Sequence, residues 1–273
     1  MNYWYFALIG LGIALLFVIL FKDEILKASQ YLGRGEFSEN FLNDKGFVLK
    51  KSALNSLYNP DTTNKDRYLN RNINMLKSEV KTYNKLKKGN YSILPNKFYA
   101  YKEKDTGKYV IVKEYGEIPV DPNSKLFLPK WKPGSVKQEK YNKFTKELYL
   151  IAKHEGHFED HIQPALRKNG DLFITDLGLF VSYEDQISND RIVKKSRNDF
   201  KISESERRRK YREVNDKLRH LDEQLGIKHK VPDFVIKENL NHLYKEHEKR
   251  KEISELYAEN TTGSQIEFWE SKK

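Results

Sequence analysis

The sequence predicts an α+β fold in which antiparallel β-hairpins pack with helices, with a transmembrane helix before them and an antiparallel helical hairpin after them. Three observations support this fold class: an uncharged segment over residues 3–21, two hairpin signals in mid-chain, and long helical repeats in the last third. We expect four regions: an anchor and juxtamembrane helix over 1–35, an α+β soluble domain over 36–200, a helical hairpin over 201–260, and a tail over 261–273.

The uncharged segment runs from Tyr3 to Phe21 and has the length of a membrane span. Its nineteen residues would form a helix of about 29 Å, close to the ~30 Å hydrocarbon core of a bilayer. Aromatic residues cluster at its start, where their rings favour the headgroup region: Tyr3, Trp4 and Tyr5. No basic residue precedes the segment and no A-x-A pattern follows it, so we expect an uncleaved anchor rather than a signal peptide.

The flanking charges predict the orientation of this anchor. Three basic residues follow it, Lys22, Lys27 and Arg34, against only the α-amino group on the other side. The positive-inside rule therefore predicts a single-pass protein of the cell membrane, with the remainder of the chain in the cytoplasm. We expect the helix to continue as far as Gly33-Arg34-Gly35, because Ile25, Leu26 and Leu32 keep helical spacing.

The composition narrows the choice of partners. The chain carries 50 Lys and Arg against 39 Asp and Glu and has no cysteine, which excludes a disulfide framework and a lipid-modified cysteine. Residues 61–140 hold eighteen basic and nine acidic residues. Besides the lipid bilayer and a protein partner, this region could bind the phosphates of anionic lipid or of nucleic acid; a solvated basic surface is the simpler alternative.

A helix is predicted over 63–88, because Leu69, Ile73, Leu76, Val80 and Tyr83 recur at steps of four and three. Its opposite face is basic, with Lys77, Lys81, Lys85, Lys87 and Lys88. Such a face is usually the solvated side of a helix, although phosphates could bind there.

Two β-hairpins are predicted in the middle of the chain. The first spans 97–115 around the turn Asp105-Thr106-Gly107, and the second spans 162–175 around Asn169-Gly170. A helix from Ser135 to Lys153 separates them. In the loop before this helix, Trp131 either anchors a partner or folds back onto the core.

The last third of the chain is predicted to be helical. Ser203 and Glu206 form a capping-box pattern, and the helix that follows ends at Gly226. Pro232-Asp233 starts a second helix. The two helices are predicted to pack on each other as a hairpin; an exposed coiled-coil docking arm is the alternative.

A histidine cluster raises the hypothesis of a metal-dependent enzyme. His154, His157 and His161 would line one side of a continuous helix. The segment HEGHFEDH lacks the H-E-x-x-H spacing, however, and Gly156 weakens the helix. No P-loop, no G-x-S-x-G motif and no cysteine nucleophile occur, so we assign no catalytic, cofactor-binding or metal-ligating residue.

Two segments resemble parts of protein kinases. The run KFYAYKEKDTGKYVIVKEY is similar to the small-lobe hairpin whose lysine, here Lys113, meets nucleotide phosphates; the resemblance implies Glu147 as its ion-pair partner. In a competing interpretation, Asp160 begins a catalytic loop that runs to Asp176-Leu177-Gly178, similar to D-F-G. Ala165 then stands where a metal-binding asparagine is required, and no Gly-rich loop or H-R-D occurs.

These observations favour a binding role over catalysis. We expect a single-pass, membrane-anchored interaction or scaffold protein whose basic cytoplasmic domain positions a protein partner at the membrane. The alternatives are a membrane-tethered metal-dependent enzyme that uses the histidine cluster, and a noncatalytic kinase-like binding domain.

Overall fold

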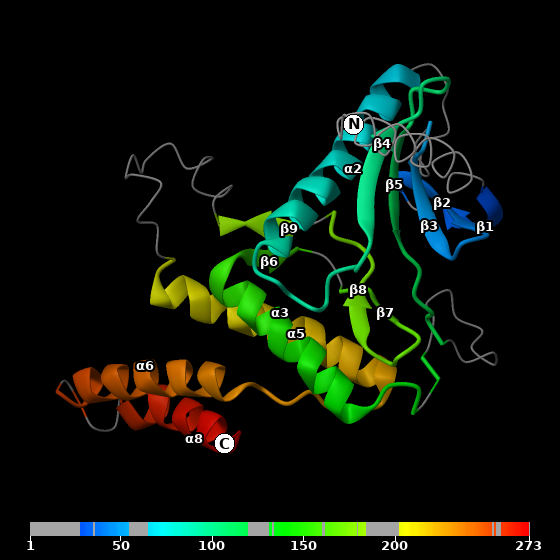
Figure 1. Ribbon diagram of the computed structural model, residues 1–273. Coiled ribbons are helices and arrows are strands. Elements are labelled where there is room, and N and C mark those ends of the chain that lie inside the picture. The colour runs from blue at the N-terminus through cyan, green and yellow to red at the C-terminus, as the bar shows by residue number, and fades with distance from the viewer. Residues whose placement is uncertain are drawn as a thin grey trace, which may run out of the picture. The chain divides into compact units, whose positions relative to one another are not determined.

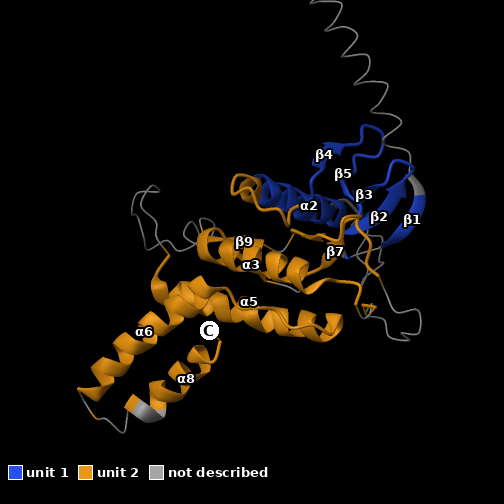
Figure 2. Ribbon diagram, turned by 60° about the horizontal axis from the view of Figure 1, so that its bottom comes forward, with its two compact units in different colours: residues 1–84, 95–115 blue, residues 85–94, 116–273 orange. Residues whose placement is uncertain are grey.

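The computed structural model of the chain (Figure 1) describes residues 28–34, 36–54, 65–119, 131–132, 134–159, 162–178, 180–183, 202–252, 254 and 258–272. These residues form two compact units (Figure 2). Unit 1 comprises the described residues up to Asn84 together with Pro95–Tyr115, and unit 2 comprises Lys85–Leu94 and the described residues from Gly116 onward. The two units divide the region that we expected as one α+β domain, and both combine helices with antiparallel strands.

Unit 1 is built on a five-stranded antiparallel sheet with the order β1-β2-β3-β5-β4. Its strands are β1 (Ala28–Arg34), β2 (Ser38–Asn43), β3 (Phe47–Ser52), β4 (Phe98–Lys102) and β5 (Tyr109–Glu114). A tight turn joins β2 to β3, where the backbone N–H of Phe47 donates to Asn43 Oδ1 at 2.8 Å and Gly46 has a φ of +76°. The predicted hairpin around Asp105-Thr106-Gly107 is confirmed as the β4–β5 pair.

Helix α2 (Lys65–Lys87) confirms the helix predicted over 63–88 and packs along one face of this sheet (Figure 1). Its buried side is rotated from the predicted apolar stripe and includes Asn72, Leu76, Glu79 and Tyr83. Three residues of the predicted stripe are only half buried: Leu69, Ile73 and Val80. The rotation follows because Asn72 and Glu79 find buried hydrogen-bond partners in unit 1, which the periodicity of apolar residues cannot reveal.

Strand β1 corrects the prediction of a juxtamembrane helix that reaches residue 35. Its residues pair antiparallel with β2, and the rings of Tyr31 and Phe41 lie 5.4 Å apart. Gly33, with a φ of +140°, lies at a shift in the pairing register. The predicted span, Tyr3–Phe21, lies outside the described residues. Among the helices that are described, none is both long and apolar enough to cross a bilayer.

Unit 2 begins with helix α3 (Gln138–His154), which confirms the helix predicted between Ser135 and Lys153. Four short strands follow: β6 (Gly156–Phe158), β7 (Pro164–Leu166), β8 (Leu172–Ile174) and β9 (Phe180–Ser182). Strand β6 pairs with β9, and the β7–β8 pair confirms the second predicted hairpin. Trp131 is buried, which favours the interpretation in which it folds back onto the core.

Helix α5 (Glu204–Leu225) has the two ends that its sequence predicts. Ser203 Oγ accepts a hydrogen bond from the backbone N–H of Glu206 at 3.2 Å, and Gly226 ends the helix in the left-handed conformation. The helix packs along α3 (Figure 2), where Tyr141 Oη donates to Asp222 Oδ1 at 2.7 Å.

Helix α6 (Asp233–Lys251) does not form the predicted hairpin with α5. The link between the two helices folds back on α5, and α6 starts beside the first half of α5, where Arg207 Nε donates to Glu238 Oε2 at 2.9 Å. The partner of α6 is the C-terminal segment that we expected as a loose tail. This segment forms η2 (Glu259–Gly263) and α8 (Ser264–Glu270), which run antiparallel to α6.

Candidate functional site

A buried ionic cluster in unit 1 joins α2 to the sheet. The Glu79 side chain is 1% exposed, and its two carboxylate oxygens contact different lysines. Lys50 Nζ on β3 lies 2.6 Å from Oε2, and Lys113 Nζ on β5 lies 3.1 Å from Oε1. Because one carboxylate faces two ammonium groups away from water, the loss of Glu79 would leave two buried cations without this counter-ion.

The alternation of side chains in β3 places Lys50 in this cluster. Leu49 points to the sheet face opposite α2, so its neighbour Lys50 points toward α2. A second hydrogen bond fixes the helix nearby, because Asn72 Nδ2 donates to the backbone carbonyl of Ala53 at 2.8 Å. Helix α2 is therefore tied to the second half of β3 and to the residue that follows it, through groups that are all buried.

The kinase-like pair predicted between Lys113 and Glu147 is wrong. Lys113 pairs with Glu79, whereas Glu147 lies on α3 in unit 2. There Glu147 accepts hydrogen bonds from Ser92 Oγ at 2.6 Å and from the backbone N–H of Ile93 at 3.0 Å. The helix that covers the sheet of unit 1 is α2, which precedes the β4–β5 hairpin in the sequence. We expected α3, which follows the hairpin.

Sequence reasoning missed Lys50 and Glu79. Lys50 follows two apolar strand residues, Val48 and Leu49, in the same way as Lys113 follows its own apolar run, and this similarity could have drawn attention to it. Glu79 is one of only two acidic residues in α2. Its burial depends on the rotation of α2, so a hydrophobicity pattern alone gives no signal for it.

One contact in unit 1 is similar to an ion pair that protein kinases use. In protein kinases a lysine on the third strand forms an ion pair with a glutamate on the helix that follows. Here Lys50 is on the third strand and Glu79 is on the next helix. Lys113, which occupies the other oxygen of Glu79, is an addition to that pair.

In unit 2 the segment similar to D-F-G directly follows the β7–β8 hairpin. Asp176 Oδ1 accepts a hydrogen bond from the backbone N–H of Gly178 at 2.9 Å, and Leu177 is fully buried. Ala165 lies on β7 opposite Phe173 and is also fully buried. A core methyl group thus occupies the position counted as the metal-binding asparagine, while Asp160 lies outside the described residues.

The histidines do not lie on one helix. Helix α3 ends at His154, and Gly156 starts β6 with a φ of +153°. A Cβ atom at Gly156 would lie 2.1 Å from the backbone oxygen of Val181, so glycine is required where β6 pairs with β9. His157 is a buried strand residue, and His161 lies outside the described residues. The prediction of a continuous helix is therefore wrong.

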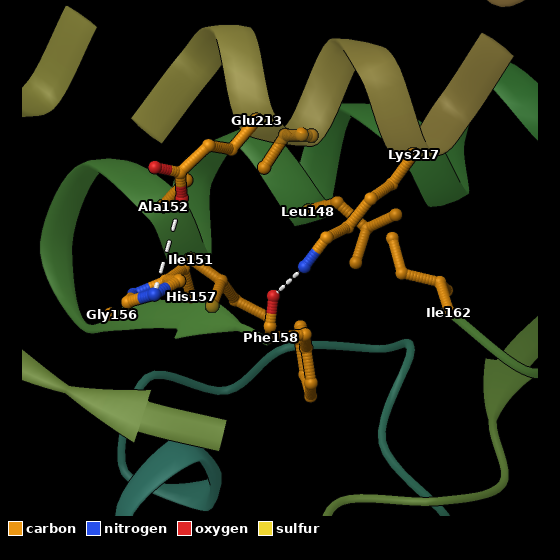
Figure 3. A pocket seen from close by; sticks show the side chains of 10 residues that line it. Leu148, Ile151, Ala152, Gly156, His157, Phe158, Ile162, Glu213 and Lys217 are labelled. Carbon is orange, nitrogen blue, oxygen red and sulfur yellow. Dashed lines mark hydrogen bonds and ion pairs between the residues drawn. The ribbon is translucent and has the colours of Figure 1, made fainter. Parts of the chain in front are cut away.

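His157 faces helix α5 in a closed polar cluster (Figure 3). Its Nε2 lies 4.0 Å from Glu213 Oε2, as Figure 3 shows. The same ring nitrogen lies 2.9 Å from Lys210 Nζ, which donates to Glu213 Oε2 at 3.0 Å. Lys217 donates to the backbone oxygen of Phe158. The cavity that His157, Glu213 and Lys217 line together with apolar residues of α3, α5 and β6 measures about 10 Å³, which is at the lower limit for one water molecule. It has no room for a substrate.

The protonation state of His157 follows from its surroundings. Burial, and then the positive charge of Lys210, lower the pKa of His157 to about 4. The neutral ring accepts the proton of Lys210 at Nε2, and its Nδ1 is buried without a hydrogen-bond partner among the described residues. These contacts join α5 to β6. Across the described part of the chain, no three residues of the metal-ligating types gather at one point.

Comparison with known proteins gives only weak similarity, in structure and not in sequence. No protein-family model and no curated protein matches the chain. A solved structure described as an apo pseudokinase is similar to it with a TM-score of 0.36 and 12% sequence identity, over 57% of this chain and 60% of that chain. The chain thus spans less than two thirds of that structure's length.

Proposed function

We propose that this protein is a membrane-anchored, noncatalytic kinase-like protein that binds a protein partner and holds it at the cytoplasmic surface of the membrane. The observation that carries the kinase-like part is the buried ion pair between Lys50 on the third strand and Glu79 on the helix after it. The anchoring part rests on the apolar segment Tyr3–Phe21 and on the basic residues that follow it.

Two observations support a noncatalytic role. Phosphoryl transfer in protein kinases requires a catalytic aspartate and an asparagine that binds Mg²⁺. The segment from Glu159 to Leu166 reads EDHIQPAL and contains no asparagine. Its last three residues form β7, in which Ala165 packs into the core. A metal ligand at this position would have to displace packed apolar side chains.

The test of the noncatalytic role compares phosphotransfer with partner capture in the full-length protein. We expect phosphotransfer from Mg²⁺-ATP to equal that of the variants Asp176→Asn and Lys50→Met. Photocrosslinking in cells should capture a discrete protein partner in the membrane fraction. Turnover that both substitutions abolish, with no captured protein, would show an enzyme instead.

The substitution Ala165→Asn separates a lost metal ligand from a repacked core. The larger polar side chain should destabilise unit 2 by about 1–3 kcal/mol, because the position is fully buried. We expect no Mg²⁺-dependent rise in melting temperature in the presence of ATP. Such a rise in the variant, absent from the wild type, would contradict the noncatalytic packing of this site.

The orientation has its own test. Protease added to intact cells should leave the C-terminal region undigested, and should digest it once the membrane is permeabilised. Digestion from outside intact cells would place the chain after the anchor on the outer side of the membrane.

A further inference from the structure

The face of the unit 1 sheet opposite α2 carries one continuous row of apolar side chains. Tyr31 pairs with Phe41, Phe41 with Leu49, Leu49 with Val112, and Val112 with Tyr99. Residues that are directly opposite each other in neighbouring strands point to the same side. The row therefore crosses all five strands of the sheet, from β1 at one edge to β4 at the other.

This face is layered. Its inner residues Leu49, Val110 and Val112 are fully buried, and larger aromatic side chains pack against them while staying partly exposed. We call the outer layer the aromatic face; it consists of Tyr31, Phe41, Phe47, Tyr99 and Tyr101. It points away from α2, because the lysines that alternate with the inner residues point toward Glu79.

The aromatic face is most exposed at the two edges of the sheet. Tyr31 on β1 is 56% exposed and Tyr99 on β4 is 45% exposed. Four strand spacings separate these residues, which is a distance of about 19 Å. A flat surface, rather than one inserted side chain, is the partner that could cover both rings.

Ammonium groups lie over this layer. Lys97 Nζ lies 4.9 Å from the ring centroid of Phe47. Lys51 Nζ lies 5.8 Å from that of Phe41 and is paired with the Glu103 carboxylate at 2.6 Å. Tyrosine rings with polar tips and lysines with apolar stems are side chains that favour the boundary between hydrocarbon and headgroups. The chemistry of the face therefore matches the headgroup layer of a bilayer.

The chain connection places this face near the membrane if the anchor is inserted, so this step rests on the proposed function. Strand β1 begins at Ala28, seven residues after Phe21. A fully extended chain spans at most ~3.5 Å per residue, so the start of β1 can lie no more than about 25 Å from the end of the anchor. Tyr31 follows three residues later.

We propose that the aromatic face lies against the headgroup layer of the membrane in which the chain is anchored, and that α2 faces away from the lipid. The anchor and this face would then act as two membrane contacts on one chain. In this arrangement the basic side of α2, which includes Lys77, is directed toward the cytoplasm and stays accessible to other molecules.

The absence of cysteine from the chain allows a direct test with single spin labels. The full chain is reconstituted into vesicles of phosphatidylcholine and phosphatidylglycerol with a label at Tyr31→Cys, Tyr99→Cys, Lys77→Cys or Leu15→Cys. Collision with oxygen, which enters lipid, is compared with collision with a nickel chelate, which stays in water. We expect an oxygen-to-nickel ratio several-fold higher at positions 31 and 99 than at 77, and the highest ratio at 15.

Each other outcome has a defined meaning. A lipid-like label at 15 with water-like labels at 31 and 99 overturns the docking proposal and leaves the anchor intact. A water-like label at 15 overturns the anchor itself. A lipid-like label at 77 alone assigns the lipid contact to the basic side of α2. Labels at 31 and 99 that are shielded from both reagents, with or without vesicles, assign the face to a protein contact.

A fifth labelled position tests whether removal of a tyrosine ring disturbs the aromatic face. Lys97→Cys removes an exposed lysine and leaves all five rings in place. Its label should report the same several-fold higher ratio as position 99. A water-like label at 97 in folded, inserted protein would also overturn the proposal.

Discussion

The two units each contain a buried ionic cluster, but the clusters balance charge in different ways. In unit 1 the deeply buried group is the Glu79 carboxylate, which is 1% exposed and holds two lysines. In unit 2 the deeply buried group is the Lys210 ammonium, which is 2% exposed and is held by a neutral histidine and by Glu213. The Glu213 side chain is 32% exposed and keeps contact with water.

This difference predicts different sensitivities. In unit 1 one carboxylate that is almost completely buried faces both lysines. In unit 2 a neutral ring shares the task with a partly hydrated carboxylate, so the loss of one charge is milder, but a protonated ring would face a buried cation. Unit 1 should therefore be vulnerable to substitution, and unit 2 to acid.

The largest expected effect is that of Glu79→Gln. Removal of the charge takes a buried carboxylate away from the ammonium groups of Lys50 and Lys113, at a cost of about 3–5 kcal/mol. Hydrogen exchange of the α2 amides, read alongside denaturant unfolding, measures the loss. Glu103→Gln is the matched control, because its pair with Lys51 is about one fifth exposed and should cost at most about 1 kcal/mol. Equal costs would contradict the dependence on one carboxylate.

Acid should affect unit 2 through His157. Its pKa in the folded chain is about 4, below the ordinary value of about 6.5. As the pH falls from 6.5 toward 4, the unfolded chain takes up a proton that the folded chain resists, so stability present at pH 7 is lost over this range. The charged groups that face the ring are Lys210, Glu213, Lys217 and Arg209.

The measurement compares the free energy of unfolding at pH 7 and pH 4.5. The wild type should lose about 2 kcal/mol more than His157→Gln, since the variant has no ring to protonate. His220→Gln, at an exposed position on α5, should behave as the wild type does. If His157→Gln follows the pH profile of the wild type, the ring does not set the acid sensitivity.

Lys210→Met tests whether the loss of one charge costs less in unit 2 than in unit 1. We expect a cost of about 1–2 kcal/mol in hydrogen exchange over α5. Glu213 is partly hydrated and also accepts a hydrogen bond from Arg209 Nη1 at 2.8 Å, so it is not left alone. A cost as large as that of Glu79→Gln would erase the difference between the two clusters.

The smallest expected effect concerns the N-terminal cap of α5 rather than the cluster of His157, Lys210 and Glu213. Ser203→Ala removes the cap of the Glu206 N–H and should cost about 1 kcal/mol. Ser205→Ala removes a hydroxyl that lies 3.1 Å from Ser203 Oγ but leaves the cap itself in place, and it should change stability by less than about 0.5 kcal/mol. Hydrogen exchange over the first turn of α5 measures the loss. Equal exchange in the two variants would show that the contacts of Lys210, and not the cap, hold this end of the helix.

Local features of the sequence predicted the helices and hairpins well. The cap at Ser203, the left-handed stop at Gly226 and the turn at Asn169-Gly170 depend on neighbouring residues alone, and all are found. The spacing of apolar residues located α2 and α3 for the same reason. Phe98–Glu114 folds as the predicted hairpin because its alternating strands meet at a short turn.

Tertiary structure decided the rest, because it depends on which distant segments pair. Leu32 keeps the helical spacing of Ile25 and Leu26, yet residues 28–34 form a strand because they pair with β2. Nothing in the local sequence of α2 buries Glu79. It is buried because Lys50 and Lys113, from two distant strands, pair with it. His154 and His157 fall on different elements because Gly156 pairs with β9. The sequence by itself determined the two ends of α5 and the turns of the predicted hairpins. Contacts across long stretches of chain decided where β1 pairs and which polar groups are buried together.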